Sequence, residues 1–254
     1  MYVKGFNPGV VVLVSGGVDS SVLVHYVARE LGKTRIHALS FNYGQRHSRE
    51  LECAAYQAKA AGAVNCMKFE GARAIAENFD GVGLVNDIER NLGFALAGKR
   101  VLMMGAGGAA RGAVLPLLSG GPALFAIANR TIAKAKSLGR HFAGHARLVT
   151  GGYGDFGDEP FDVVINATSA SLRGELPPLD PRVFAVGGLA CDMVYGKGMT
   201  PFLRLAWNAG AGRLADGVGM LAEQAAEAFE WWRGVRPPTA PMIGTACAAS
   251  FCET

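Results

Sequence analysis

The stretch that decides the fold is residues 98–118, GKRVLMMGAGGAARGAVLPLL. The apolar run at 100–104 predicts a buried strand, and residues 109–118 carry apolar side chains at helical spacing. Between the two stands the turn Gly105-Ala106-Gly107-Gly108-Ala109. Glycines at such a turn let the backbone approach a pyrophosphate, and free N–H groups at the helix start attract its charge. The stretch predicts a dinucleotide-binding turn, with a plain tight turn as the alternative.

Strands and helices keep alternating after this turn. Further strands are expected at 124–128, 147–149, 163–166 and 189–193. Helices are expected at 132–142, 201–209 and 220–233. Alternation at this spacing is typical of a doubly wound parallel sheet, so we predict an α/β fold of the Rossmann type.

Basic residues follow the second strand of this series. Asn129-Arg130-Thr131 come directly after it, and Lys134 lies one helical turn later. An NAD site usually carries Asp or Glu here for the ribose diol. A guanidinium and an ammonium suit a 2′-phosphate instead, so the cofactor predicted is NADP. The alternative, a solvated basic patch, is less favoured because cations oppose the dipole at a helix start.

The front of the chain carries a second nucleotide-binding pattern. Residues 10–14 read as a strand buried on both faces, followed by a helix from 20, a strand at 36–41 and a helix at 48–61. The first turn can wrap an anion with backbone N–H groups and hydroxyls, and its aspartate can hold Mg²⁺. The candidate ATP phosphate loop is Ser15, Gly16, Gly17, Asp19 and Ser20. Short strands at 64–69 and 73–77 and a helix at 82–92 are also expected.

Composition limits the kinds of partner that the protein is expected to bind. The 254 residues have a net charge of +4, and the Lys and Arg residues are scattered along the chain, which argues against a nucleic-acid-binding surface. The start of the chain lacks the pattern of a signal peptide, and its apolar run is too short for a membrane span. Five cysteines without close pairing favour a reduced cytoplasmic setting. Cys247 and Cys252 lack the partners and spacing of a zinc site, so no metal is expected, and a homodimer is left open.

From about residue 62 to 243 the chain resembles shikimate dehydrogenases. The motifs are GAVN (62–65), ENFDGVGLVNDIERNLG (77–93), GAGGAARG (105–112), ANRT (128–131), INATS (165–169), DMVYGKGMTPFL (192–203) and ADGVGMLAEQAAEAF (215–229). The family interconverts shikimate and 3-dehydroshikimate by hydride transfer with NADP, in aromatic amino acid biosynthesis. The resemblance implies the same small-molecule substrates for this chain.

The resemblance also implies a set of site residues. Substrate contacts would come from Asn65, Asp80, Tyr195 and Gln224, with Asp80 catalytic. Cofactor contacts would come from Gly105, Ala106, Gly107, Gly108, Ala109, Asn129, Arg130, Thr131, Lys134, Met193 and Gly217. Without the family, Asp80 before Gly81 also reads as a turn former, and Tyr195 as a strand-end aromatic.

Residues 10–64 resemble the start of a different family, 7-cyano-7-deazaguanine synthase of queuosine biosynthesis. The matching stretches are SGGVDS (15–20) and ALSFNYGQRHSRELECAA (38–55). That family uses ATP to adenylylate a carboxylate substrate. It also needs the rest of its own sheet and a cysteine cluster for zinc, which this chain does not carry. The sequence therefore predicts a chimera.

The junction has a consequence for catalysis. Shikimate dehydrogenases pair the aspartate matched by Asp80 with a lysine from an NVT-x-P-x-K segment ahead of the AVN motif, and this chain has no such segment. The paired serines that hold the substrate carboxylate are missing as well. We expect NADP binding with impaired shikimate turnover. The alternatives are an ATP-dependent ligase fragment and a non-catalytic NADP-binding module.

The expected domains follow from the two resemblances. A small open parallel-sheet domain would occupy residues 1–93, with 1–64 from the ATP-binding fragment and 65–93 from the shikimate-binding domain. The Rossmann domain would occupy 94–243, and its last helix would return toward the front domain. Residues 244–254 would form an unstructured tail.

Overall fold

The computed structural model describes residues 10–14, 36–40, 65–70, 73–142, 144, 148–157, 159–196 and 198–244. The chain divides into two compact units, Met1–Arg49 and Glu50–Thr254. In the first unit, β1 (Val10–Val14) and β2 (Ile36–Ser40) form a parallel pair, as expected. The candidate phosphate loop at 15–20, the helices expected from 20 and at 48–61, and the tail from 245 lie outside the described residues.

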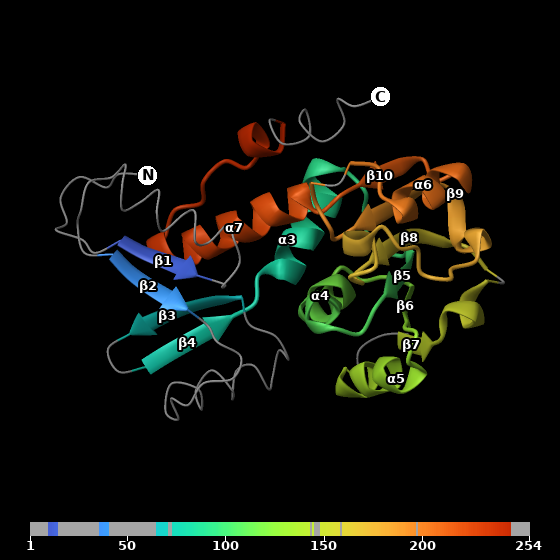
Figure 1. The fold of residues 1–254 in the computed structure, drawn as a ribbon, viewed down its shortest axis with the longest axis horizontal. Helices are drawn as coiled ribbons and strands as arrows, with labels where there is room; N and C mark the ends of the chain where they lie inside the picture. The colour runs from blue at the N-terminus through green and yellow to red at the C-terminus, as the bar shows by residue number, and fades with distance from the viewer. Residues whose placement is uncertain are drawn as a thin grey trace. The chain divides into compact units, whose positions relative to one another are not determined.

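The second unit contains a six-stranded parallel sheet (Figure 1). Its strands are β5 (Arg100–Met104), β6 (Leu124–Ala128), β7 (Leu148–Gly151), β8 (Phe161–Asn166), β9 (Phe184–Asp192) and β10 (Arg213–Ala215). They lie in the order β7-β6-β5-β8-β9-β10, and every neighbouring pair is parallel. The chain winds outward from β5 to β7, then returns to β8 and winds the other way. This is the predicted Rossmann-type doubly wound sheet.

Helices cover both faces of this sheet. They are α3 (Asp80–Asn86), which a π-helical turn η1 (Asp87–Asn91) continues, α4 (Gly108–Ser119), α5 (Ile132–His141), α6 (Pro201–Asn208) and α7 (Val218–Arg233). Successive strand side chains point to opposite faces. Val101 and Met103 therefore pack in one core with residues of α4 and α5, whereas Leu102 and Met104 pack in a second core with α6. Burial on both faces explains why the strand sequences are almost continuously apolar.

Some element boundaries differ from those expected. β9 begins at Phe184 instead of 189, because Gly187 and Gly188 interrupt its apolar pattern where the ladder with β8 shifts register. β10 is not among the expected strands, since three residues are too few to show a period. Helix α3 starts at Asp80, two residues earlier than expected. Within the described ranges, no helix has the length and apolar character needed to cross a membrane.

A hairpin precedes α3. Its strands β3 (Cys66–Glu70) and β4 (Arg73–Glu77) pair antiparallel, with Cys66 opposite Glu77. The backbone N–H of Asn65 extends the ladder by donating to the carbonyl of Glu77 at 3.0 Å. The hairpin thereby holds Asn65 beside the residues that lead into α3.

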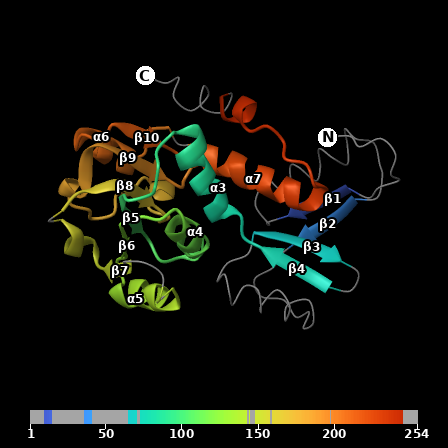
Figure 2. The same ribbon diagram turned by 180° about the vertical axis from the view of Figure 1, so that it is seen from behind.

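Glycines allow α3 to lie unusually close to two other helices. A Cβ on Gly83 would come within 2.6 Å of the backbone nitrogen of Gln224 on α7. A Cβ on Gly81 would overlap the carbonyl oxygen of Gly112 on α4. Figures 1 and 2 show α3 beside α7 from opposite sides. Close packing at these glycines fixes the start of α3, and with it Asp80, relative to α4 and α7.

Candidate active site

The carboxyl ends of the central strands meet at one edge of the sheet. Met104 at the end of β5 lies opposite Ala128 of β6 and Asn166 of β8, and Asn166 lies opposite Asp192 of β9. The winding reverses between β5 and β8, and open α/β sheets bind ligands at that point. We call the turns that leave this edge, at 105–109, 129–134, 167–171 and 193–196, the cofactor edge.

Backbone hydrogen bonds extend the ladders one residue into these turns. The N–H of Gly105 donates to the carbonyl of Ala128 at 2.8 Å, and the N–H of Ala167 donates to Met104 at 2.8 Å. The N–H of Met193 donates to the carbonyl of Asn166 at 3.0 Å. Because main-chain bonds fix these turns, their positions depend little on which side chains surround them.

The glycine turn after β5 leaves room for a ligand. Gly105 has a φ of +112°, and a Cβ there would come within 2.8 Å of the carbonyl oxygen of Ala167. A Cβ on Gly107 or Gly108 would meet nothing within 4 Å. Helix α4 begins at Gly108, and its N-cap Gly107 has no side-chain cap. Within the described part of the chain, the space beside the start of α4 is therefore open, and the first N–H groups of a helix can bind an anion there.

Cations occupy the neighbouring turn. Arg130 and Lys134 are both exposed, at the end of β6 and in the first turn of α5. The side-chain amide of Asn129 donates to the carbonyl of Thr131 at 2.9 Å and holds the turn between them. The backbone of Arg130 is hydrogen-bonded to Tyr153, whose pKa is raised because burial disfavours its ionised form. The predicted 2′-phosphate residues therefore lie at the same edge as the glycine turn.

The two residues predicted to line the nicotinamide are neighbours. The N–H of Gly217 donates to the carbonyl of Val194 at 3.1 Å, and a Cβ on Gly217 would overlap the carbonyl oxygen of Met193. Only glycine permits this approach of α7 to the turn after β9. Met193 and the start of α7 are thereby held together at the edge.

A buried polar network supports the cofactor edge, and sequence reasoning assigned it no role. Asp192 accepts hydrogen bonds from Ser171 Oγ at 2.6 Å, Thr200 Oγ1 at 2.7 Å and Asn166 Nδ2 at 3.2 Å. All four side chains are at most 3% exposed. The network ties the turn after β8 to the turn after β9, so both keep one arrangement. The sequence signal that could have revealed this network is that two neighbouring strands end in polar residues, Asn166 and Asp192.

Three of the four predicted substrate residues come together. Asn65 Nδ2 donates to Asp80 Oδ1 at 2.7 Å and to Gln224 Oε1 at 3.4 Å. Asn65 Oδ1 also accepts from the N–H of Phe79 at 2.9 Å. Burial raises the pKa of Asp80, and hydrogen bonds with Asn65 and Asn78 only partly offset that effect. We call Asn65, Asp80 and Gln224 the substrate cluster.

Tyr195 differs from these three residues. It follows β9 and its side chain is 54% exposed. None of the hydrogen bonds in the described part of the chain joins it to the substrate cluster. Its predicted contact with substrate is therefore not preformed by a hydrogen bond to the cluster.

Lys68, three residues after Asn65 in the sequence, packs against aromatic residues. Its Nζ lies 4.6 Å from the centroid of the Trp231 ring near the end of α7. Phe79 contacts the same ring edge-on, with 5.7 Å between centroids. This cation–π contact fastens the hairpin to α7. The ammonium of Lys68 thus has a place in the packing of the hairpin.

Three family models match the chain. The model described as Shikimate / quinate 5-dehydrogenase matches residues 87–173, and the Shikimate 5′-dehydrogenase C-terminal domain matches 217–247. Queuosine biosynthesis protein QueC matches 9–86. A shikimate dehydrogenase (NADP(+)) of Nitrosospira multiformis is 56% identical over 192 residues, which cover 76% of this chain and 70% of the relative. The chain belongs to the shikimate dehydrogenase family.

A second curated relative agrees with this assignment, and solved structures share the fold. The shikimate dehydrogenase (NADP(+)) of Dechloromonas aromatica is 56% identical over 74% of this chain and 68% of its own length. The crystal structure of an Ael1 enzyme from Pseudomonas putida has a TM-score of 0.78 and 41% identity, covering 94% of this chain and 98% of that one. Shikimate 5-dehydrogenase from Thermus thermophilus, in complex with NADP(H) and shikimate, shares the fold with a TM-score of 0.73 at 24% identity, covering 95% of this chain and 100% of that one.

Proposed function

We propose that this chain binds NADP(H) along the cofactor edge and shikimate or 3-dehydroshikimate at the substrate cluster. The observation that carries the proposal is the open turn at Gly107 and Gly108, with Arg130 exposed after the neighbouring strand and Lys134 exposed in the first turn of the helix that follows. The curated relatives are named as NADP(+) enzymes, which supports the same cofactor here. A helix start without side-chain caps and two cations suit the pyrophosphate and the 2′-phosphate respectively.

The remaining residues take the roles that the family implies. The turn from Gly105 to Ala109 would cradle the pyrophosphate, and Asn129 and Thr131 would hold the adenosine end beside Arg130. Met193 and Gly217 would contact the nicotinamide, and Tyr195 would face the substrate from the turn after β9. The exposure of Tyr195 leaves its side chain accessible to a ligand.

The chemistry of the substrate cluster centres on one proton. Bound NADP⁺ accepts the hydride of a secondary alcohol, and the hydroxyl proton must leave at the same time. Asp80 is the carboxylate that would accept a hydrogen bond from that hydroxyl, and Asn65 holds it in orientation at 2.7 Å. No lysine segment precedes Asn65 to share the proton, and loss of a positioned acid or base lowers a rate by about 10²–10⁴. We therefore expect slow turnover.

The cofactor half of the proposal is tested by replacing both cations. The variant Arg130→Ala/Lys134→Ala should bind NADPH about 100-fold more weakly, because it loses two charge-assisted contacts. Its affinity for NADH should change less than about threefold, since NADH has no 2′-phosphate. Nucleotide fluorescence titrations measure both constants. Lys136→Ala, exposed on the same helix, is the matched control. Equal losses for NADPH and NADH would contradict the assignment.

The substrate half is tested by adding shikimate to the complex with NADP⁺. Calorimetry should show binding of shikimate, and NADPH formation should be measurable but about 10²–10⁴ slower than in a family member with the lysine segment. Binding of NADPH with neither shikimate binding nor NADPH formation would identify a non-catalytic cofactor-binding module instead.

An ATP-dependent activity is the second candidate function, and the match of residues 9–86 to the QueC family favours it. Its loop, Ser15 to Ser20, lies outside the described residues and stays a prediction. Release of pyrophosphate from ATP with Mg²⁺ would support it.

Four other expectations from the sequence also stay predictions. They are the domain boundary near residue 93, the unstructured tail, the cytoplasmic location and the homodimer.

A further inference from the structure

Glu223 is a buried carboxylate next to a residue of the substrate cluster. It lies on α7 directly before Gln224 and is only 3% exposed. Its Oε1 accepts hydrogen bonds from Asn91 Nδ2 at 3.1 Å and from Thr239 Oγ1 at 2.5 Å, and its Oε2 accepts from Arg236 at 2.5 Å. A buried charge is tolerated when it is paired and fully hydrogen-bonded, as it is here.

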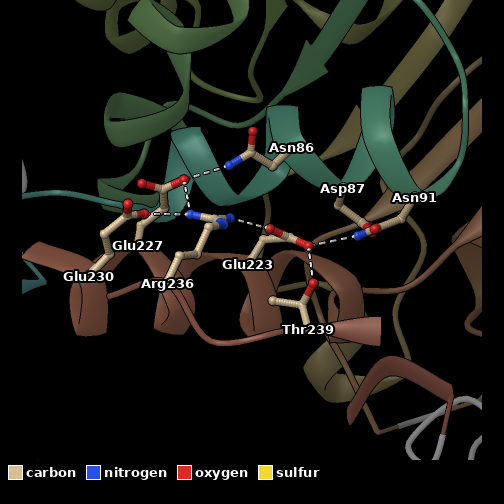
Figure 3. Close-up of polar contacts among 8 residues, drawn as sticks. All are labelled: Asn86, Asp87, Asn91, Glu223, Glu227, Glu230, Arg236 and Thr239. Carbon is tan, nitrogen blue, oxygen red and sulfur yellow. Dashed lines mark hydrogen bonds and ion pairs between the residues drawn. The ribbon is translucent and has the colours of Figure 1, made fainter. Parts of the chain in front are cut away.

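Arg236 holds more than one carboxylate of α7. Its Nη2 donates to Glu223, and its Nη1 donates to Glu227 at 2.5 Å and to Glu230 at 3.4 Å (Figure 3). The side chain of Arg236 is 26% exposed, and its ion pairs with Glu223 and Glu227 are less screened by solvent than surface pairs. The fork of the guanidinium suits this arrangement, because it presents several donors in fixed directions.

Residues 234–239 form what we call the C-terminal strap. Helix α7 ends at Arg233, and the following Gly234 has a φ of +71°, which reverses the chain so that Arg236 and Thr239 can return to α7. Pro237 and Pro238 stand between these two anchors and restrict the backbone. The C-terminal strap therefore contacts α7 through two residues, Arg236 and Thr239, and the two prolines between them restrict how these residues can move relative to each other.

The same carboxylates also connect α7 to α3 and η1. Asn86 Nδ2 donates to Glu227 at 2.7 Å, while Asn91 Nδ2 bridges Glu223 and Asp87, at 3.1 and 3.0 Å (Figure 3). Burial by itself would raise the pKa of Glu223, but its hydrogen bonds with Thr239, Asn91 and Arg236 outweigh burial and lower it. Glu223 is therefore ionised at neutral pH, and its position matters to both helices.

We infer that Arg236 is a positioning residue, which holds α7 against α3 so that Gln224 stays within reach of Asn65 and Asp80. The inference deepens the proposed function and depends on it for the identity of the ligand. Asp80 begins α3 and Gln224 follows Glu223 on α7, so a turn or slide of α7 would open the substrate cluster. Arg236 itself does not touch the cluster and acts through Glu223 and Glu227.

The test compares Arg236→Met, which keeps an unbranched apolar chain in place of the aliphatic part but removes the charged guanidinium, with Arg236→Lys. Arg182→Met is the control, because Arg182 pairs with Asp180 on the exposed side of another element. Side-chain amide signals of Gln224 and Asn65 are followed by NMR in the full chain. Affinities for NADPH alone, and for shikimate with NADP⁺ present, are measured by calorimetry.

We expect Arg236→Met to shift the amide signals of Gln224 and Asn65 and to weaken shikimate binding about tenfold, with NADPH affinity changed less than twofold. Arg236→Lys keeps the charge but not the fork of the guanidinium, so both effects should be present and smaller than in Arg236→Met. Three outcomes would overturn the inference. The amide signals of Gln224 and Asn65 could stay unchanged in Arg236→Met, or Arg182→Met could have an equal effect. The third outcome is a lower melting temperature of Arg236→Met with equal changes in the affinities for shikimate and NADPH. If the unaltered chain binds NADPH but not shikimate, the proposed substrate is wrong, and the amide signals alone decide the role of Arg236.

Discussion

The cofactor edge is assembled from turns that follow strands along residues 105–196, whereas the substrate cluster joins Asn65 to Gln224, 159 residues later. Main-chain hydrogen bonds and the buried side-chain network around Asp192 hold the first region, and these hydrogen bonds join residues that lie between 104 and 217. Side-chain contacts and glycine-mediated helix packing hold the second. A change at the front of the chain would therefore leave the first region intact and affect the second.

Because of this difference, we expect the proposed chimera to keep NADP binding more easily than shikimate turnover. The proposed junction near residue 64 lies before every turn of the cofactor edge, but directly before Asn65 of the substrate cluster. A pyrophosphate is held by backbone N–H groups and a helix start. A substrate is held by side chains from several segments, some of them expected ahead of the junction. The following experiments separate the two regions.

The largest effect on stability is expected where helices meet. Gly219→Ala should lower the free energy of unfolding by about 1–3 kcal/mol, because a Cβ there would overlap the carboxylate of Asp87, which is buried and hydrogen-bonded to Asn91 and so has little room to move away. Thermal melting measures the loss. Gly154→Ala is the control, since a Cβ at Gly154 would meet nothing within 4 Å. Equal melting temperatures for Gly219→Ala and the unaltered chain would show that the packing of α7 on η1 is not rigid.

An intermediate effect is expected at the cofactor edge, on binding and not on folding. Gly108→Ala introduces no contact within 4 Å, so the melting temperature should stay the same or rise slightly. NADPH affinity should fall about tenfold, because the added methyl group takes space that a phosphate would approach. Fluorescence titration of NADPH measures the change. Full affinity in a stable Gly108→Ala variant would place the phosphates elsewhere.

The smallest effect is expected from the charge of Asp216, at the start of α7. Among the described residues, its Oδ2 is buried without a hydrogen-bond partner, and burial raises the pKa of Asp216. A raised pKa means that the folded protein holds this proton more tightly than the unfolded chain. The contribution of Asp216 to stability therefore falls as the pH rises from 3.8, the ordinary pKa of an aspartate, through the raised value.

Asp216→Asn removes the buried negative charge and with it the loss of stability that this charge causes above the raised pKa. We expect a gain in unfolding free energy of up to about 1 kcal/mol at pH 7, which disappears as the pH approaches 4. Thermal melting across this range measures the gain. Asp180→Asn should show no gain at pH 7, because Arg182 lowers the pKa of Asp180. A gain for Asp216→Asn that is independent of pH would refute the electrostatic explanation.

Much of the sheet was predictable because its signals are local. Apolar runs predicted β5, β6 and β8 within two residues, and glycine or polar residues marked the turns between them. The early start of β9 and the short β10 were missed, since a register shift and a three-residue strand leave no periodic trace. The antiparallel pairing of β3 with β4 also required the structure, because the sequence placed these two strands in a parallel-sheet domain and no local pattern gives the direction in which they pair.

The sequence by itself determined the cofactor edge. A strand, a glycine turn, a helix and two cations follow one another along the chain, and main-chain hydrogen bonds between neighbouring strands bring the turns to one edge of the sheet. It also carried the motifs through which Asn65, Asp80 and Gln224 were recognised. Only the tertiary structure decided that these three side chains touch, and that Arg236 joins Glu223 and Glu227 beside Asn86 and Asn91. Contacts between side chains far apart in sequence depend on how helices pack, and no local pattern encodes that packing.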